Sequence, residues 1–204
     1  MDKLIVENIS VLRGRKSVIS NLTVAFNSAS LVAIEGNNGS GKSTFLDAIA
    51  GLISISEGEV FLDGKALRTL SYSDRASYIS YVPSRKTTAA ALEVKTAIAV
   101  GDVFGKKKNR VEEAIHKFNL NELQNNLLTE LSDGEYQRVQ LARVWVQDTP
   151  IVLLDEPAAH LDATSRENLF AELLKWAEED KKLVIVCSHE LNLNQRFASR
   201  IIQF

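Results

Sequence analysis

Residues 36–44 read GNNGSGKST, a loop with three glycines that ends in Lys-Ser-Thr. The stretch fits the pattern G-x-x-x-x-G-K-[ST]. A short apolar segment, SLVAIE, precedes it at residues 30–35, and a segment with helical periodicity, FLDAIAGL, follows it at residues 45–52. The glycines allow successive backbone N–H groups to turn toward phosphate oxygens, and the N-terminus of the following helix adds a positive dipole. The stretch therefore predicts a phosphate-binding loop between a buried strand and a helix.

Lys42 and Ser43 have the most specific expected roles in this loop. A lysine at this position reaches the β- and γ-phosphates of a nucleotide, and the hydroxyl that follows it holds Mg²⁺. A chance glycine-rich turn would not combine the full pattern with a strand before it and a helix after it. The sequence therefore predicts a nucleotide site that includes Gly36, Asn37, Asn38, Gly39, Ser40, Gly41, Lys42, Ser43 and Thr44.

A second polar group follows the apolar run IVLL at residues 151–154, where Asp155 and Glu156 stand side by side. Ligands of a parallel sheet bind at the carboxyl ends of its strands, so we expect this pair beside the phosphate loop. Asp155 is expected to hold Mg²⁺ through water, and Glu156 to orient or deprotonate an attacking water. Another apolar run, LVIVC at residues 183–187, ends just before His189, which we expect to face the γ-phosphate.

The composition limits the classes of function. A chain of 204 residues that is 45% hydrophobic suffices for one domain with a substantial core. Its net charge of −2 gives no general basic field, so we expect no nucleic acid or anionic membrane as a direct partner. No stretch approaches the roughly 20 apolar residues of a membrane span, and we expect no signal peptide. Cys187 is the single cysteine, and its apolar surroundings indicate a buried reduced thiol, which suits the cytosol.

The hydrophobic pattern divides the single domain, residues 1–204, into three stretches. Residues 1–83 and 147–204 contain short apolar strands that alternate with helices, which favours an α/β core with a mainly parallel sheet. The strand-rich beginning predicts an N-terminal antiparallel β subdomain. Residues 84–146 show helical periodicity instead, and this predicts an inserted helical subdomain.

Some local features have defined expectations. The helix after the phosphate loop is expected to place Phe45, Leu46, Ile49 and Leu52 on its apolar face. A second amphipathic helix is expected over residues 165–181, opened by a Ser-x-x-Asn stretch rather than by a full capping box. The basic run GKKKNR, at residues 105–110, is expected to be a solvated loop.

Taken together, these motifs resemble those of the ATP-binding cassette (ABC) ATPases, the nucleotide-binding subunits of ABC transporters. GNNGSGKST resembles the Walker A loop of that family and IVLLDE its Walker B strand. LSDGE at residues 131–135 resembles the LSGGQ signature, AAHLD at residues 158–162 the D-loop, and His189 the switch histidine. The motifs stand in the family's order over essentially the whole chain. The resemblance implies a P-loop NTPase fold of the ABC type, ATP and Mg²⁺ as cofactors, and hydrolysis of ATP with Glu156, His189 and Lys42 as catalytic residues.

The resemblance also implies that a second copy of the chain completes the site. In this family two cassettes stack head to tail, and the signature of one copy closes over the ATP that the other copy's Walker A loop holds. Ser132 and Gly134, at the start of a predicted helix, would then contact the γ-phosphate on the partner copy. Asp162 of the D-loop is likewise expected to bind that nucleotide. Closure of such a dimer would exclude water from the reaction.

The signature departs from the family pattern at two positions. Asp133 replaces a glycine and Glu135 replaces a glutamine. An acid close to a triphosphate repels it unless the carboxylate points away. We expect the direct contacts, from Ser132 and Gly134, to remain.

Two further departures concern the nucleotide site itself. Ser84 stands where the family has a glutamine that reaches the metal and the membrane partner, so the serine is the expected metal neighbour. Its side chain is too short for both contacts, so either water fills the gap, a neighbour such as Arg85 substitutes, or turnover and coupling are altered. The family stacks an aromatic ring on adenine near VLRGR, residues 11–15, where this chain has none, and Arg13 is therefore the expected stacking group.

The segments YISYVPS, ALEVKTAIAVG and LARVWVQDTPIVLLDEPAAHLD, at residues 78–84, 91–101 and 141–162, are similar to those of importers of iron complexes, haem and cobalamin. The similarity implies a homodimer, peripheral on the cytoplasmic face of the membrane, under integral permease subunits that a substrate-binding protein supplies. An exporter subunit is an alternative that the nucleotide motifs do not separate. A non-transport ABC ATPase is a second alternative, against which stands the lack of a coiled-coil or zinc insertion. A weakly active structural partner is a third, against which stand Glu156 and His189.

Overall fold

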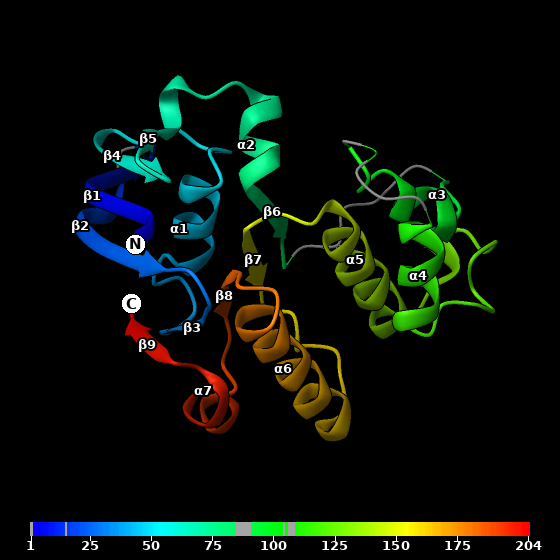
Figure 1. Cartoon of the computed structure of the whole chain (residues 1–204). Helices are drawn as coiled ribbons and strands as arrows, with labels where there is room; N and C mark the ends of the chain where they lie inside the picture. The colour runs from blue at the N-terminus through cyan, green and yellow to red at the C-terminus, as the bar shows by residue number, and fades with distance from the viewer. Residues whose placement is uncertain (1, 15, 85–90, 104, 106–108) are drawn as a thin grey trace.

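The computed structural model describes residues 2–14, 16–84, 91–103, 105 and 109–204 of the chain. Two sheets organise this part of the molecule (Figure 1). The first is antiparallel, with strand order β2-β1-β4-β5. Its strands are β1 (Asp2–Arg13), β2 (Lys16–Asn27), β4 (Glu57–Leu62) and β5 (Lys65–Ala66).

The second sheet has strand order β6-β7-β8-β3-β9, and every neighbouring pair is parallel. Its strands are β3 (Ser30–Glu35), β6 (Ile79–Val82), β7 (Ile151–Asp155), β8 (Leu183–Cys187) and β9 (Arg200–Gln203). The prediction of an α/β fold with a mainly parallel core sheet and an N-terminal antiparallel sheet is thus confirmed.

Strands β7 and β8 read as continuous apolar runs because both faces of their sheet are covered. Successive side chains point to opposite faces, so Ile151 and Leu153 join the core shared with the antiparallel sheet, whereas Val152 and Leu154 join the core on the other face. Cys187 is fully buried, and this burial raises the pKa of its thiol, as expected for a structural cysteine.

Helix α1 (Lys42–Ile49) lies between the two sheets, where Phe45, Leu46 and Ile49 are fully buried. The opposite face of the parallel sheet is covered by α6 (Ala163–Glu178), by α7 (Leu191–Phe197) and by one side of α5 (Asp133–Gln147). Helix α2 (Tyr72–Tyr78) leads into β6. None of the helices that the structure describes is long and apolar enough to cross a membrane.

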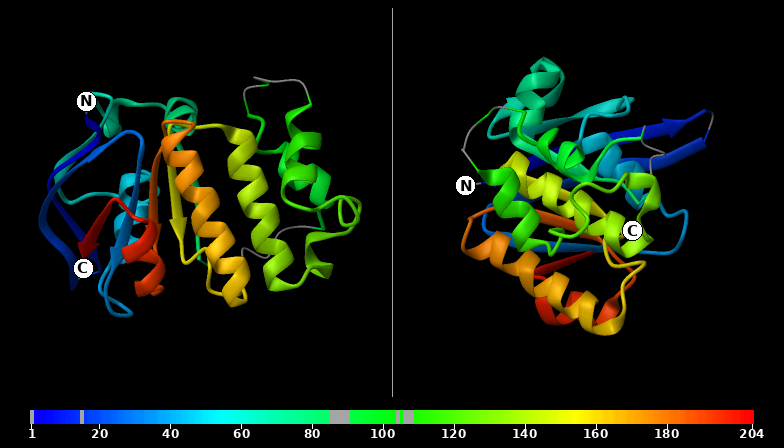
Figure 2. Two further views of the ribbon diagram at one scale, coloured as in Figure 1. Left: turned by 60° about the horizontal axis from the view of Figure 1, so that its bottom comes forward. Right: turned by 90° about the vertical axis from the view of Figure 1, so that its right-hand side faces the viewer.

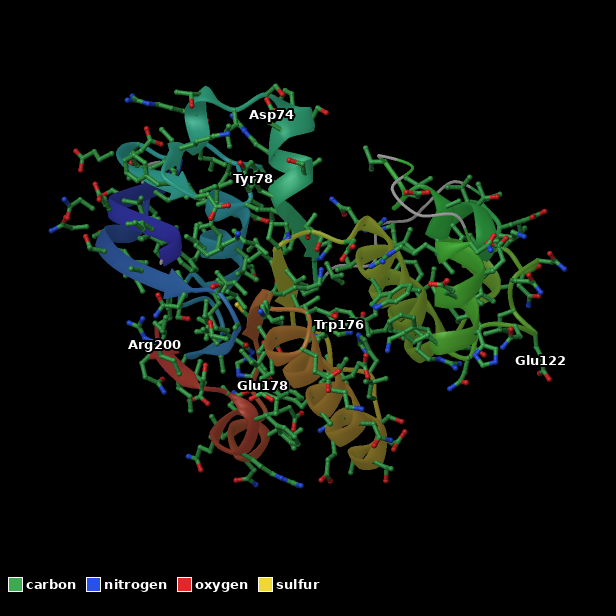
Figure 3. The ribbon with its side chains drawn as sticks, in the orientation of Figure 1. Asp74, Tyr78, Glu122, Trp176, Glu178 and Arg200 are labelled. Atoms are coloured by element: carbon green, nitrogen blue, oxygen red, sulfur yellow. The ribbon has the colours of Figure 1, made fainter. Side chains whose placement is uncertain are left out.

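A third core lies away from the sheets, around α3 (Val94–Ala99), α4 (Arg110–Lys117) and the other side of α5. Figure 2 shows α5 between α6 and the α3–α4 pair, and Figure 3 places Glu122 at the outer edge of this helical region. Because Leu141 and Val144 of α5 face the sheet while Val139 and Ala142 face α3 and α4, this helix belongs to both cores. The division at residues 84–146 stays a prediction.

Three local predictions were wrong. Helix α1 ends at Ile49, so Leu52 lies in the following turn, with 64% of its surface exposed. Helix α6 begins at Ala163 rather than at Ser165, because the side chain of Asp162 accepts a hydrogen bond from the backbone N–H of Ser165 and caps the helix.

The third concerns the basic run at residues 105–110, of which Lys106, Lys107 and Lys108 lie outside the described residues. Arg110 is buried rather than solvated. Its guanidinium lies 4.2 Å from the ring centroid of Trp145 and 3.1 Å from the carboxylate of Asp148. A cation–π contact and an ion pair therefore draw this arginine into the protein.

Candidate functional site

The loop from Gly36 to Gly41 connects the end of β3 to the start of α1. Gly36 and Gly41 have φ values of 155° and 110°. A Cβ atom on Gly36 would lie 2.5 Å from the carbonyl oxygen of Phe204, and one on Gly41 would lie 3.2 Å from Val18 Cγ1. Both positions therefore need glycine, for the backbone conformation and for the space.

Lys42 is the first residue of α1, and its side chain lies back across the loop. Its Nζ donates hydrogen bonds to the carbonyl oxygens of Gly36, at 2.8 Å, and Asn37, at 3.2 Å. The carbonyl of Asn37 also accepts a bond from the N–H of Ser40, at 3.1 Å. A buried ammonium group thus stands at the positive end of a helix dipole, and both features attract an anion.

A cleft of about 520 Å³ opens beside this loop. Six of the nine loop and helix positions expected to bind nucleotide line it, and Gly36, Asn37 and Ser40 are not among its lining residues. The lining also includes the predicted residues Arg13, Ser84, Asp155 and Glu156. The six positions from the loop and α1 are Asn38, Gly39, Gly41, Lys42, Ser43 and Thr44, and the remaining lining residues are Val18, Asp47, Tyr81 and Pro83.

Asp155 is the last residue of β7 and is only 2% exposed. Its Oδ1 atom is buried and has no hydrogen-bond partner among the described residues. Ser43, in the same cleft, has an exposed side chain. Oxygen ligands of this kind are the ones that Mg²⁺ prefers, and Mg²⁺ commonly takes only one or two carboxylates together with water and phosphate oxygens. The donor set therefore fits the expected metal.

The described part of the chain contains no cluster of three or more His, Cys, Asp or Glu residues able to hold a metal ion. Phosphate oxygens and water would therefore complete the coordination. Ser84 lines the cleft and stays a predicted metal neighbour, while Arg85 lies outside the described residues.

Glu156 follows Asp155 and adopts a left-handed backbone conformation, with φ of 52°. Its N–H donates to the carbonyl oxygen of Cys187, at 2.9 Å, and its Oε1 lies 3.1 Å from Nε2 of His189. Burial raises the pKa of the Glu156 carboxyl, and the charges of His189 and Lys42 oppose part of that rise. A non-glycine residue with positive φ is uncommon and is often found at functional sites.

Asp47 and Tyr81 line the cleft but were not among the predicted site residues. The hydroxyl of Tyr81 donates to Asp47 Oδ1, at 3.1 Å, and Arg13 Nη2 lies 3.3 Å from Asp47 Oδ2. Burial, with the nearby carboxylates of Asp47 and Asp155, raises the pKa of Tyr81. The sequence carried a signal for Asp47, since it lies four residues after Ser43 and so on the same helix face.

The signature residues line a different cleft, of about 610 Å³. Ser132, Gly134 and Asp162 all belong to it, and no residue is shared with the cleft at the phosphate loop. The second cleft also contains basic side chains, those of Lys117, Arg138 and His160. The structure thus separates the predicted nucleotide contacts of one chain into two groups.

Two caps shape the second cleft. Ser132 caps α5, and its N–H and hydroxyl donate to Glu135 Oε2, at 2.9 and 2.6 Å. These hydrogen bonds lower the pKa of Glu135. Asp162 caps α6 and accepts from the hydroxyl of Ser165 at 2.6 Å, which lowers the pKa of Asp162. The carboxylate of Glu135 therefore accepts a hydrogen bond from the hydroxyl of Ser132, the group that is expected to contact a phosphate.

A phosphate loop beside an acidic strand end, with a histidine next to the second acid, is the arrangement of a P-loop nucleotide hydrolase. Residues 19–159 match the family described as ABC transporter, and the chain belongs to this family, whose members hydrolyse ATP. The hemin import ATP-binding protein HmuV of Pseudomonas fluorescens (strain Pf0-1) is 32% identical over 205 residues, which cover 96% of this chain and 80% of that protein. The thiamine import ATP-binding protein ThiQ of Vibrio vulnificus (strain YJ016) is 35% identical over 175 residues, which cover 83% of this chain and 74% of that protein.

Among solved structures, the dimeric structure of MJ0796, a bacterial ABC transporter cassette, matches with a TM-score of 0.88. Its sequence is 28% identical, and the match covers 98% of this chain and 94% of that one. A dimeric post-hydrolysis state of MJ0796, bound to ADP and Pi, matches with a TM-score of 0.84. The predicted family and fold are confirmed.

Proposed function

We propose that the chain energises import through a separate membrane permease, by binding and hydrolysing ATP between two copies of itself. The observation that carries this proposal is the division of the site into two clefts. Lys42, Asp155 and Glu156 lie at one cleft, and Ser132 and Gly134 lie at the other. Stacking two copies head to tail would bring each loop against the other copy's signature helix. The dimeric relative MJ0796 supports this arrangement.

Within one such site, the phosphate loop binds and the acidic strand end reacts. Lys42 and the N–H groups of Gly39–Gly41 would hold the phosphates, and Ser43 and Asp155 would hold Mg²⁺. The metal ion, when bound, would supply positive charge that offsets the charge of the phosphates. Catalysis would rest on positioning and charge stabilisation.

Glu156 would act as the general base. Its carboxylate takes a proton from the water that attacks the γ-phosphate in line. The 3.1 Å contact between Glu156 Oε1 and His189 Nε2 would position that carboxylate. His189 would face the γ-phosphate. Through its contact with Glu156, it would make the position of the base depend on whether that phosphate is bound.

We further propose a solute of the iron-complex, haem or cobalamin type. Similarity to the hemin import protein HmuV supports this class, and similarity to the thiamine import protein ThiQ supports import more generally. The chain would then act as a peripheral subunit on the cytoplasmic face of the membrane. Its partners would be a second copy, integral permease subunits and, indirectly, a substrate-binding protein.

Capture of the membrane partner tests the transport proposal. The Glu156→Gln protein, tagged and expressed in its own host, is solubilised from membranes in mild detergent with ATP present. A multi-span membrane protein in the eluate supports the proposal, provided that a Lys42→Ala control recovers much less of it. Ribosomal or DNA-bound partners without a membrane protein would sink the proposal in favour of a non-transport ATPase.

The solute class requires a second measurement on the captured complex. The complex is placed in proteoliposomes with its binding protein, and ATP hydrolysis is measured with hemin, a ferric siderophore, cobalamin or thiamine. Stimulation by one of the first three supports the proposed class. Stimulation by thiamine alone, or export of a solute from the vesicles, would contradict it.

A further inference from the structure

Asn194 is a fully buried polar residue on α7, outside the motifs described so far. Its Nδ2 donates to Glu35 Oε1, at 2.9 Å, and to the carbonyl oxygen of Ser188, at 3.4 Å. Its Oδ1 is buried without a hydrogen-bond partner among the residues that the structure describes. Both neighbours of Nδ2 are acceptors, so the opposite orientation of the amide would place oxygen against oxygen. The side chain therefore acts as a donor to two groups.

Glu35 is the last residue of β3, immediately before the phosphate loop, and is 7% exposed. Gln203 of β9 donates to its Oε2, at 2.7 Å, and the N–H of Phe204 donates to its main-chain carbonyl, at 2.8 Å. No basic side chain in the described part of the chain forms an ion pair with it. Two neutral amides thus hold this carboxylate in place beneath Gly36.

Ser188 is the first residue after β8 and directly precedes His189. Its N–H donates to the carbonyl oxygen of Ile34, at 3.3 Å, so the ends of β3 and β8 lie side by side. The amide of Asn194 spans these two ends. One side chain therefore connects the base of the phosphate loop to the base of the segment that carries His189.

We propose that Asn194 is a positioning residue for ATP hydrolysis. By holding the carboxylate of Glu35 and the carbonyl of Ser188, it fixes the spacing between the phosphate loop and the His189–Glu156 pair. It touches neither of the two reacting groups. This inference rests on the proposed roles of the phosphate loop, Glu156 and His189, and it adds the contact that keeps them in register.

The substitution Asn194→Asp tests this role with a side chain of the same size. It replaces the donor by an oxygen that faces the carboxylate of Glu35, and two carboxylates at hydrogen-bond distance repel one another. At about pH 8 we expect kcat to fall by roughly 10-fold or more, because misplacement of reacting groups by an ångström has effects of that order. The KM for ATP should change much less, since no residue expected to contact the nucleotide is replaced.

Two carboxylates in contact share a proton at a raised pKa. The ratio of variant kcat to wild-type kcat should therefore rise as the pH falls from about 8 to about 6. The other charged groups around α7 are the ion pairs Arg166–Glu190 and Arg196–Glu167, and the reacting pair is Glu156–His189. These groups are present in both proteins, so taking the ratio at each pH removes their own titration.

Reciprocal exchange provides the rescue. Adding Glu35→Gln to Asn194→Asp restores one amide and one carboxylate with the donor on the other side, and the exposed amide of Gln203 can turn to accept. This double variant restores the hydrogen bond between positions 35 and 194 but not the bond to the carbonyl of Ser188, so we expect it to recover part of the lost kcat at about pH 8. A double variant whose kcat at about pH 8 is no higher than that of Asn194→Asp alone would overturn the proposal.

Thr149→Val is the matched control. Thr149 is buried, and its hydroxyl donates to Ser80 Oγ at 2.8 Å, near the amino ends of β6 and β7 and away from the site. The Thr149→Val substitution removes a buried hydrogen bond, as Asn194→Asp does. We expect it to lower the melting temperature while leaving kcat unchanged. An equal loss of kcat in the control would show that Asn194 acts only through stability.

Amide hydrogen exchange separates this inference from the proposed function. Asn194→Asp should speed exchange in residues 36–44 and 188–190 together, and Thr149→Val should not. If the wild type hydrolyses no ATP but both segments respond, the ATPase proposal fails, and what remains is the structural connection that Asn194 makes between the two segments. If the wild type hydrolyses ATP and Asn194→Asp leaves kcat and both segments unchanged, the positioning role of Asn194 is refuted. Should Asn194→Asp not fold, Asn194→Ala loses the same donors without the repulsion, and it must still loosen both segments.

Discussion

The carboxylate of Glu156 and the imidazole of His189 lie 3.1 Å apart, Oε1 to Nε2, and this contact joins the carboxyl ends of β7 and β8. The N–H of Glu156 donates to the carbonyl oxygen of Cys187 in the neighbouring strand, and the backbone of Glu156 is left-handed. Glu156 therefore reaches the cleft of the phosphate loop while one of its oxygens is held by the histidine.

Substitution of Glu156 by glutamine tests the assignment of the base. Glutamine keeps the shape of the side chain but takes no proton, so we expect kcat to fall by about 100-fold or more. ATP should still bind, and the variant should accumulate as an ATP-bound dimer. Steady-state hydrolysis, equilibrium ATP binding and light scattering with ATP measure the three properties.

Glu167→Gln is the control for that experiment. Glu167 forms a surface ion pair with Arg196, away from the acidic strand end, and its loss should leave turnover near the wild-type value. Near-normal turnover in Glu156→Gln would remove Glu156 from its assigned role.

The pH dependence follows from the raised pKa of Glu156. The base is protonated, and activity is lost, at a higher pH than for an ordinary glutamate. The charge of His189 lowers this pKa, so His189→Ala should shift the acid limb of the kcat profile to still higher pH. An acid limb that stays in place, or moves to lower pH, would contradict this reading of the contact.

The same raised pKa has a consequence for stability. Between the unfolded and the folded pKa of Glu156, the folded chain binds more protons than the unfolded chain. The contribution of Glu156 to stability is therefore present below the unfolded pKa and is lost as the pH rises through the folded pKa. Glu156→Gln should accordingly melt at a higher temperature than the wild type at about pH 8, and the difference should shrink as the pH falls toward about 4.

The strands and the phosphate loop were predictable because their signals are local. IVLL and LVIVC are buried on both faces of a parallel sheet, and such strands need continuous apolar sequence. Two helix boundaries were predicted wrongly, because local turn and cap geometry outweighs periodicity at helix ends. Helix α1 stops at Ile49, before Leu52, and the cap by Asp162 starts α6 at Ala163, before Ser165. Arg110 was misjudged because its partners, Trp145 and Asp148, are distant in sequence.

The candidate site, too, could be predicted only where its residues follow from local motifs and strand topology. Residues at the carboxyl ends of parallel strands must meet at one edge, so the grouping of Lys42 with Asp155 and Glu156 could be predicted from topology. The contact between Glu35 and Asn194 could not, because it joins residues 159 apart and neither belongs to a motif. Which oxygen is left without a partner, as in Asp155, also depends on packing that no sequence pattern encodes.

Ser84→Gln tests the departure from the family at the metal neighbour. Ser84 lines the cleft with Ser43 and Asp155, and a longer amide there would extend toward the metal position. We expect unchanged ATP binding and turnover that is preserved or raised, measured at saturating ATP and Mg²⁺. Ser84→Ala is the control for loss of the hydroxyl alone. A large loss of turnover in Ser84→Gln would show that this cleft is adapted to serine.

Substitution of Arg13 tests how the adenine ring of the nucleotide is bound. Its guanidinium is paired with Asp47 at the rim of the cleft, and such a plane can stack on adenine. Stacking on a base contributes about 1–3 kcal/mol, so Arg13→Ala should weaken ATP binding by roughly 10-fold. Arg13→Tyr should retain affinity, because an aromatic ring offers the same stacking surface. Equal losses in both variants would mean that the ion pair with Asp47, rather than stacking, is what binding requires.

Substitution of Glu135 tests whether the start of the signature helix contacts the ATP of a partner copy. Its carboxylate accepts a hydrogen bond of 2.6 Å from the hydroxyl of Ser132, the group expected to meet the partner copy's γ-phosphate. Glutamine at this position keeps an oxygen for the cap but removes the negative charge, so the phosphate should compete more easily for Ser132. In the Glu156→Gln background we therefore expect Glu135→Gln to tighten the ATP-dependent dimer several-fold, measured by analytical ultracentrifugation at graded protein concentrations. Ser132→Ala, which loses both the cap and the phosphate contact, should weaken the dimer. A weaker dimer in Glu135→Gln would mean instead that the carboxylate itself holds Ser132 in the geometry that the partner copy's ATP requires.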